Sequence, residues 1–121
     1  MSDVGRRFEL AGRAASAGRY ELAAYEADEL QEAFEELPAA ELPKEGNTSI
    51  LLPTAEAFAK GPARDLQKSA ESKNAKAFDD AFRQAAAACN GCHIASGHAF
   101  IVVPTQPGKS VPDLDPLPRD R

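Results

Sequence analysis

The sequence predicts an all-α protein, built as an antiparallel four-helix bundle with an extended, proline-rich tail at its C-terminus. Apolar residues recur at steps of three and four along four segments, which is the spacing of the buried face of a helix. Alanine is abundant, and it is the strongest helix former. Three prolines and a Gly-Asn pair between residues 38 and 53 mark one longer connection.

Length and composition narrow the kinds of protein that the chain can be. Its 121 residues suit one domain, which we place at residues 1–103, followed by the tail at residues 104–121. A net charge of −5 argues against nucleic-acid binding, because that function needs a basic face. No stretch approaches the roughly 18 apolar residues of a membrane-spanning helix, so we expect no membrane span.

The first helix is predicted for residues 3–17. Ser2 and Asp3 are good N-cap residues, and Gly18 suits the position just past the end of the helix, where the backbone becomes left-handed. The buried face of this helix consists of apolar residues at helical spacing: Val4, Phe8, Ala11 and Ala15.

The second helix begins near Tyr20 and is expected to end at Pro38, because proline interrupts a helix. Its buried stripe alternates steps of three and four: Tyr20, Ala23, Ala27, Leu30, Phe34 and Leu37. The opposite face carries glutamates, which we expect to be solvated: Glu21, Glu26, Glu29, Glu32 and Glu36. Residues 38–53 are predicted to form a crossover loop.

A third helix is predicted to start with Thr54 as its N-cap. It should be kinked or interrupted at Gly61-Pro62, where proline suits the first turn of a new segment. The fourth helix is predicted to begin at Lys73 or Asn74. One of its faces carries Phe78, Phe82, Ala85 and Cys89. Helix is not expected from Gly97 onward, and the segment "FIVVP" is expected to be extended.

The two cysteines of the chain and one of its two histidines fall in "CNGCH", residues 89–93. C-x-x-C-H is the attachment motif of c-type haem. Two intervening residues set Cys89 and Cys92 at the separation of the two vinyl groups on one edge of the macrocycle. His93 then faces the iron from the proximal side. We therefore expect one haem c, with its iron, per chain.

The residues around the motif suit a large, flat group. Four alanines at residues 85–88 and Gly91 are small enough to let the ring lie close to the helix backbone. Phe78 and Phe82 lie further back on the same face, where we expect them to pack against the face or the edge of the porphyrin. The expected cofactor-binding residues are thus Cys89, Cys92, His93, Phe78 and Phe82.

Two other interpretations of the cysteines stay open. Zinc could be held by Cys89, Cys92 and either His93 or His98, which would make the chain a zinc-stabilised interaction module. Structural zinc sites, however, usually take their ligands from two separated segments. A redox dithiol normally opens a helix that follows a strand, and no strand is predicted before this motif.

The second histidine, His98, lies five residues after His93 and beyond Gly97. We keep it as a candidate second iron ligand. A contact to a haem propionate, or to the haem of a neighbouring subunit, would require less distortion of the chain.

Four predicted helices with C-x-x-C-H on the last one resemble the cytochrome c-prime group. The chain is also similar to bacterial c-type cytochromes with "LAAYE" on the second helix and C-x-x-C-H-x-A-x-G-H-x-F-I near the end. The resemblance implies that Cys89 and Cys92 are thioether anchors and that His93 is the proximal ligand. The chain departs from the cytochrome c-prime group after the motif, where it turns at Ser96-Gly97 and continues for more than twenty residues.

The motif and the resemblance lead us to expect a monohaem c-type cytochrome and not an enzyme. One hypothesis is an electron carrier that serves a redox partner protein. The alternative is a five-coordinate haem protein that binds NO or CO, and a homodimer is compatible with either. Haem c is attached outside the cytoplasm, so we expect a periplasmic protein. Its leader peptide would be absent from the given sequence, because "MSDVGRRFEL" has no apolar core.

Overall fold

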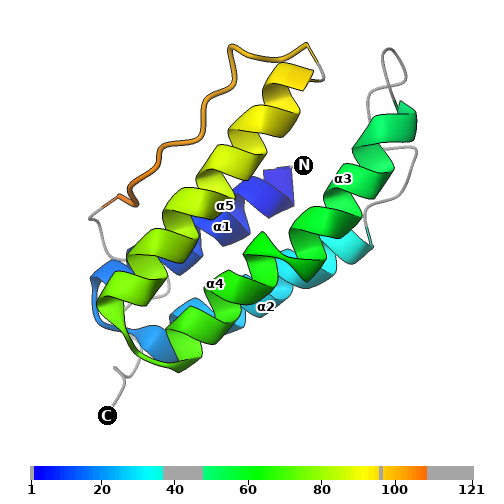
Figure 1. Ribbon diagram of the computed structural model, residues 1–121. Coiled ribbons are helices and arrows are strands. Elements are labelled where there is room, and N and C mark those ends of the chain that lie inside the picture. Colours follow the sequence, from blue (N-terminus) through cyan, green and yellow to red (C-terminus); the bar gives the residue numbers. More distant parts are fainter. Residues whose placement is uncertain (1, 37–47, 96, 109–121) are drawn as a thin grey trace.

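The computed structural model describes residues 2–36, 48–95 and 97–108, with side chains from Val4 onward in the first range and from Pro53 onward in the second. It contains five helices: α1 (Ser2–Ser16), α2 (Tyr20–Glu35), α3 (Thr48–Lys60), α4 (Pro62–Glu71) and α5 (Ala75–Ala95). Helices α3 and α4 follow one another along one side of the molecule, opposite α1 and α5 (Figure 1). The predicted all-α fold of four packed helical segments is therefore confirmed, with the third segment divided in two.

The end of α1 is built as predicted around Gly18. The φ angle of this glycine is +75°, in the left-handed region that a residue without a Cβ enters at little cost. The amide of Gly18 donates to the carbonyl of Ala15 at 3.0 Å, and the amide of Arg19 donates to the carbonyl of Ala14 at 2.8 Å. These two bonds form a Schellman motif and satisfy carbonyls that the helix end would otherwise leave unpaired.

The start of the third segment differs from the prediction. Helix α3 begins at Thr48, so Pro53 and Thr54 lie inside it and Thr54 is not an N-cap. A proline inside a helix forfeits one hydrogen bond and crowds the preceding turn. Burial of Ala55 and Phe58 on the same helix offsets that cost. The rest of the predicted crossover loop and Pro38 fall within residues 37–47, outside the described residues.

The predicted interruption after α3 is confirmed and is confined to Gly61. The amide of Gly61 still donates to the carbonyl of Ala57, and its carbonyl accepts from the amide of Asp65, both at 2.9 Å. Pro62 occupies the first turn of α4, where its missing N–H costs nothing.

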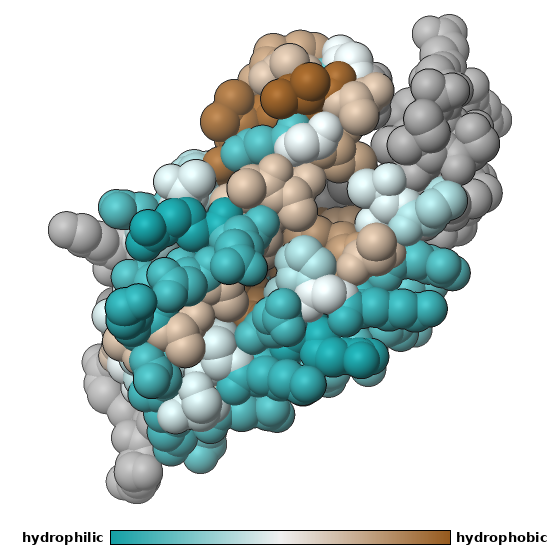
Figure 2. Space-filling model, viewed as in Figure 1, coloured by the Kyte–Doolittle hydropathy of each residue, from teal (hydrophilic) through white to brown (hydrophobic). Residues whose placement is uncertain are grey.

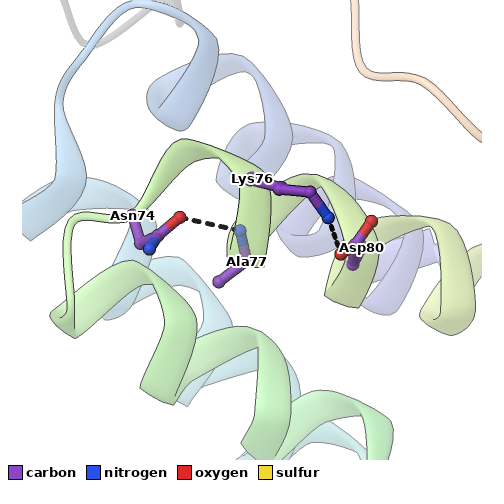
Figure 3. Close-up of polar contacts among 4 residues, drawn as sticks. All are labelled: Asn74, Lys76, Ala77 and Asp80. Carbon is purple, nitrogen blue, oxygen red and sulfur yellow. Dashed lines mark hydrogen bonds and ion pairs between the residues drawn. The ribbon is translucent and has the colours of Figure 1, made fainter.

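The junction between α4 and α5 is a tight turn. Lys73 has a φ of +55°, and the Oδ1 atom of Asn74 accepts from the amide of Ala77 at 3.0 Å (Figure 3). Asn74 is thus the N-cap of α5, one of the two starts predicted. Lys76 and Asp80 form an exposed ion pair at 3.4 Å on the next turn (Figure 3).

Alanines and phenylalanines make up most of the described core. The fully buried alanines let helix backbones approach closely: Ala11, Ala14, Ala23, Ala27, Ala59, Ala63, Ala70, Ala85 and Ala86. Two aromatic pairs connect the segments. Phe8 of α1 stacks on Phe82 of α5 with ring centroids 4.2 Å apart, and Phe34 of α2 lies 4.4 Å from Phe58 of α3.

One residue of the predicted acidic face is buried instead. Glu26 is fully buried, and its Oε1 atom lies 2.6 Å from Nη1 of Arg7 on α1. The prediction of a solvated Glu26 was wrong because this position lies beside the stripe formed by Ala23 and Ala27, at the packed boundary between α1 and α2. The exposed part of this face is acidic. Charge repulsion from Asp28 and then Glu29 raises the pKa of Glu32 there.

None of the helices in the part of the chain that the structure describes is long and apolar enough to cross a membrane.

The contact of α1 with α5 allows a test at Gly12. A Cβ atom added there would lie 2.5 Å from Cε2 of Phe82 and 2.6 Å from Cβ of Pro107, whereas one added at Gly5 would meet nothing within 4 Å. We expect Gly12→Ala to lower the free energy of unfolding by about 1–2 kcal/mol, because overpacking exceeds the gain in helix propensity. Gly5→Ala should raise it by about 0.5–1 kcal/mol. Urea unfolding followed by circular dichroism measures both. Equal stabilisation by the two variants would contradict this close contact.

The buried ion pair gives a second prediction. We expect Glu26→Ala to lower the free energy of unfolding by about 3 kcal/mol, because it removes one partner of a buried ion pair with Arg7. Glu32→Ala on the same helix should slightly raise the unfolding midpoint, since it relieves repulsion on the acidic face. That rise should shrink at high salt. A Glu26→Ala variant as stable as Glu32→Ala would show that the pair does not form.

Candidate functional site

The last third of α5 places the motif residues on one side of the helix. Cys89 and Cys92 are three residues apart, and Cys89 and His93 are four apart, so all three share a face. The helix continues through the motif to Ala95. All three side chains line a cavity of about 1170 Å³. The structure therefore brings the three residues together as the motif predicts.

The opposite walls of this cavity are largely apolar. Its apolar lining from the first three helices includes Val4, Phe8, Leu30, Phe34, Ala55 and Phe58. Arg6, Glu9 and Arg13 add charged groups from α1. The cavity is thus an apolar space between α5 and the other helices, with charge contributed from one helix.

The chain after α5 turns back and closes one side of the cavity. Gly97 has a φ of +84°, and the amides of Gly97 and His98 donate to the carbonyls of Ile94 and His93 at 3.1 and 2.7 Å. This second Schellman motif follows the end of α5 and confirms the predicted turn at Gly97. We call residues 97–108 the strap; it runs back along α5 in an extended path, with no strand assigned in it (Figure 1).

Apolar residues gather where the strap leaves α5. Figure 2 shows the hydrophobic side chains concentrated at this end of the molecule, above a largely hydrophilic lower face. The large exposed apolar residues here are Ile94, Phe100, Ile101 and Val102. Residues 101–104 of the strap also line the cavity, so the motif lies next to these exposed apolar residues.

The imidazole of His93 is held by the strap. Its Nδ1 atom lies 3.0 Å from the carbonyl oxygen of Ile101. Because a carbonyl oxygen only accepts hydrogen bonds, we assign the ring proton to Nδ1. In this tautomer the lone pair of the ring is on Nε2, the nitrogen that can coordinate a metal.

The strap is tied to the motif at a second point, Asn90. The Nδ2 atom of Asn90 donates to the carbonyl of Val103 at 3.0 Å, and its Oδ1 atom accepts from the amide of Val103 at 2.6 Å. Sequence reasoning missed Asn90 because it occupies an unassigned position inside C-x-x-C-H. The apolar run "IVV" after the helix break was the available sign that this segment packs back on the protein.

The other predicted site residues are placed less uniformly. Phe82 is 3% exposed, lines the cavity and stacks on Phe8. Phe78 is not among the residues lining this cavity. The centroid of its ring lies 6.1 Å from that of Phe82, and it borders a separate cavity of about 280 Å³. His98 lines the main cavity from the strap, with its ring 5.8 Å from that of Phe100.

Some alanines of the run before the motif pack in the core, and one lines the cavity. Ala85 and Ala86 are fully buried in the core, and Ala88 lines the cavity. A Cβ atom added at Gly91 would meet nothing within 4 Å, so the space beside this glycine is open.

Both cysteines have raised thiol pKa values. Burial, with a smaller contribution from Cys92, raises the pKa of Cys89 to about 11, and burial raises the pKa of Cys92. The thiolate is the form that attacks disulfides, so at neutral pH the pair is held as protonated thiols. This environment disfavours the redox-dithiol interpretation.

The zinc interpretation finds no ligand set among the residues that the structure describes. In the described ranges, no group of three or more His, Cys, Asp or Glu side chains is arranged to hold a metal ion. A structural zinc site needs four such ligands in a tetrahedron.

Comparisons with protein-family models, with curated proteins and with solved structures found no match to this chain.

Proposed function

We propose that the chain is a monohaem c-type cytochrome that carries electrons. Cys89 and Cys92 would hold one haem c through thioether bonds, and Nε2 of His93 would bind its iron. The observation that carries the proposal is the placement of C-x-x-C-H on a helix face that lines an apolar cavity of about 1170 Å³.

The residues present suit this cofactor in size and chemistry. Pockets for small ligands commonly measure about 300–1,000 Å³, so this cavity has room for a macrocycle. Phe8, Phe34 and Phe58 supply apolar walls, while Arg6 and Arg13 on the lining can face ionised propionates. When bound, haem supplies one-electron chemistry at its iron.

The chain's own residues would tune that chemistry. The His93 ring is held by the Ile101 carbonyl, which fixes the tautomer and makes Nε2 a stronger donor. The apolar walls exclude water and lower the local dielectric constant, which influences the reduction potential. The exposed apolar residues at the end of α5 would lie near the cofactor, where a redox partner protein could approach.

A specific observation also favours the second function, binding of NO or CO. The cavity walls from α1, α2 and α3 include Leu30 and three phenylalanines, and such side chains provide no iron ligand. Among the described residues that line the cavity, His98 is the remaining imidazole. If His98 does not bind the iron, a diatomic gas would find an open position.

The remaining parts of the proposal follow from the cofactor. Because haem c is attached outside the cytoplasm, we expect the protein to act in the periplasm. A non-enzymatic role and a homodimer remain compatible with the site. The zinc-stabilised interaction module is the third alternative, which metal analysis of the purified protein separates from the first two.

Covalent attachment is the first test of the function. Full-length protein directed to the periplasm of a host that attaches haem c should gain the mass of one haem and keep it in acid acetone. Cys89→Ala and Cys92→Ala should each keep haem through the one remaining thioether, whereas the double variant should lose it to acid acetone, since each thioether needs a thiol. Ser72→Ala, a surface change on another segment, should behave as the unchanged chain. Protein with only the cofactor-free mass, or with zinc and no iron, would contradict the proposal.

The absorption spectrum of the same protein separates the two functions. Sharp α and β bands in the reduced state would indicate six-coordinate, low-spin iron and favour electron transfer. Broad high-spin bands would indicate five-coordinate iron and favour gas binding. His98→Ala should leave the spin state unchanged if His98 is not a ligand, whereas conversion from low to high spin would identify it as the second ligand. His93→Ala should shift the Soret band in either case.

A further inference from the structure

We propose that Asn90 is a positioning residue, which holds the strap so that the Ile101 carbonyl fixes the proton and orientation of the His93 ring. The consequence for a cofactor rests on the proposed haem function. The positioning itself concerns only residues of this chain.

The two hydrogen bonds of Asn90 define one orientation of its amide. Oδ1 accepts from the Val103 amide at 2.6 Å, and Nδ2 donates to the Val103 carbonyl at 3.0 Å. Exchanging the two atoms would place donor against donor and acceptor against acceptor. The side chain therefore pairs with the strap backbone much as a neighbouring strand would.

This pairing fixes the part of the strap that His93 uses. Asn90 and His93 are three residues apart on α5, and their strap partners, Val103 and Ile101, are two residues apart. The two contacts thus lie next to one another, and neither can shift without affecting the other. The Schellman turn at Gly97 fixes one end of the strap.

The far end of the strap is also held. Pro107 approaches Gly12 so closely that an added Cβ atom would lie 2.6 Å from it. Between these two ends, the backbone of the strap meets α5 through the Asn90 and His93 side chains. Loss of the Asn90 amide would leave the Ile101 carbonyl positioned mainly by its bond to His93.

The sign of the effect on a bound iron follows from the hydrogen bond. Donation from Nδ1 to a carbonyl places more electron density on Nε2, which stabilises the ferric state over the ferrous state. A freed strap weakens this bond, so the reduction potential should rise. Partners of metal ligands change affinity by about 10–100-fold, and Asn90 acts one step further away. We expect about a tenfold change or less in the redox equilibrium constant, which is at most about 59 mV for one electron.

The experiment compares two variants of the full-length chain. Asn90→Ala removes both hydrogen bonds, and Gln84→Ala removes an exposed amide elsewhere on α5. In the haem-free chain, nitrogen-15 NMR of the imidazoles should show His93 protonated at Nδ1. Asn90→Ala should mix the two tautomers and speed hydrogen exchange at the Val103 amide, and Gln84→Ala should do neither.

In the haem-loaded chain, the reduction potential should rise in Asn90→Ala and not in Gln84→Ala. Where the haem-free chain does not fold, this comparison of potentials decides. An unchanged tautomer and potential in Asn90→Ala would overturn the positioning role. Failure of the chain to attach haem would overturn the proposed function, while the NMR comparison would still decide the role of Asn90.

Discussion

The positions of the core and of the candidate site both depend on helix α5. One face of this helix packs against the core along its first half and lines the cavity along its second half. Its first half buries Phe78, Phe82 and Ala85 against the other helices. Its second half turns Cys89 and His93 in nearly the same direction, toward a cavity. Because residues three and four apart share a face, the helix that is anchored in the core at one end must present the motif inward at the other. A break in α5 between these halves would separate the motif from the cavity.

The position of the cavity depends on the sizes of the side chains between the helices. Where small residues such as Ala70 and Ala86 are buried, α4 and α5 can pack closely. Toward the motif, α3 and α5 lie farther apart in the view of Figure 1. There the pair of Phe34 with Phe58 fixes α3 against α2, and the stack of Phe8 on Phe82 fixes α1 against α5. The aromatic pairs thus hold together, two by two, the helices that wall the cavity.

The sequence was sufficient for the fold class and for the motif, since both rest on local rules. Helical spacing, Gly18 and Asn74 located three of the helix ends to within a residue or two. Prediction from the sequence failed where tertiary packing overrides a local rule. Pro53 lies inside α3 although proline disfavours helix, and Glu26 is buried because a partner 19 residues earlier compensates its charge. Neither compensation is visible in the residues adjacent to the exception.

The strap shows most clearly why part of the site lies beyond sequence reasoning. "FIVVP" was expected to be extended, but its partner on α5 depends on how tightly the chain reverses at Gly97. That reversal sets the 13-residue separation of Asn90 and Val103 and the eight-residue separation of His93 and Ile101. Both contacts use backbone groups of the strap, which carry no mark in the sequence. The motif therefore identifies which imidazole would bind a metal, whereas only the path of the strap reveals what holds that imidazole in place.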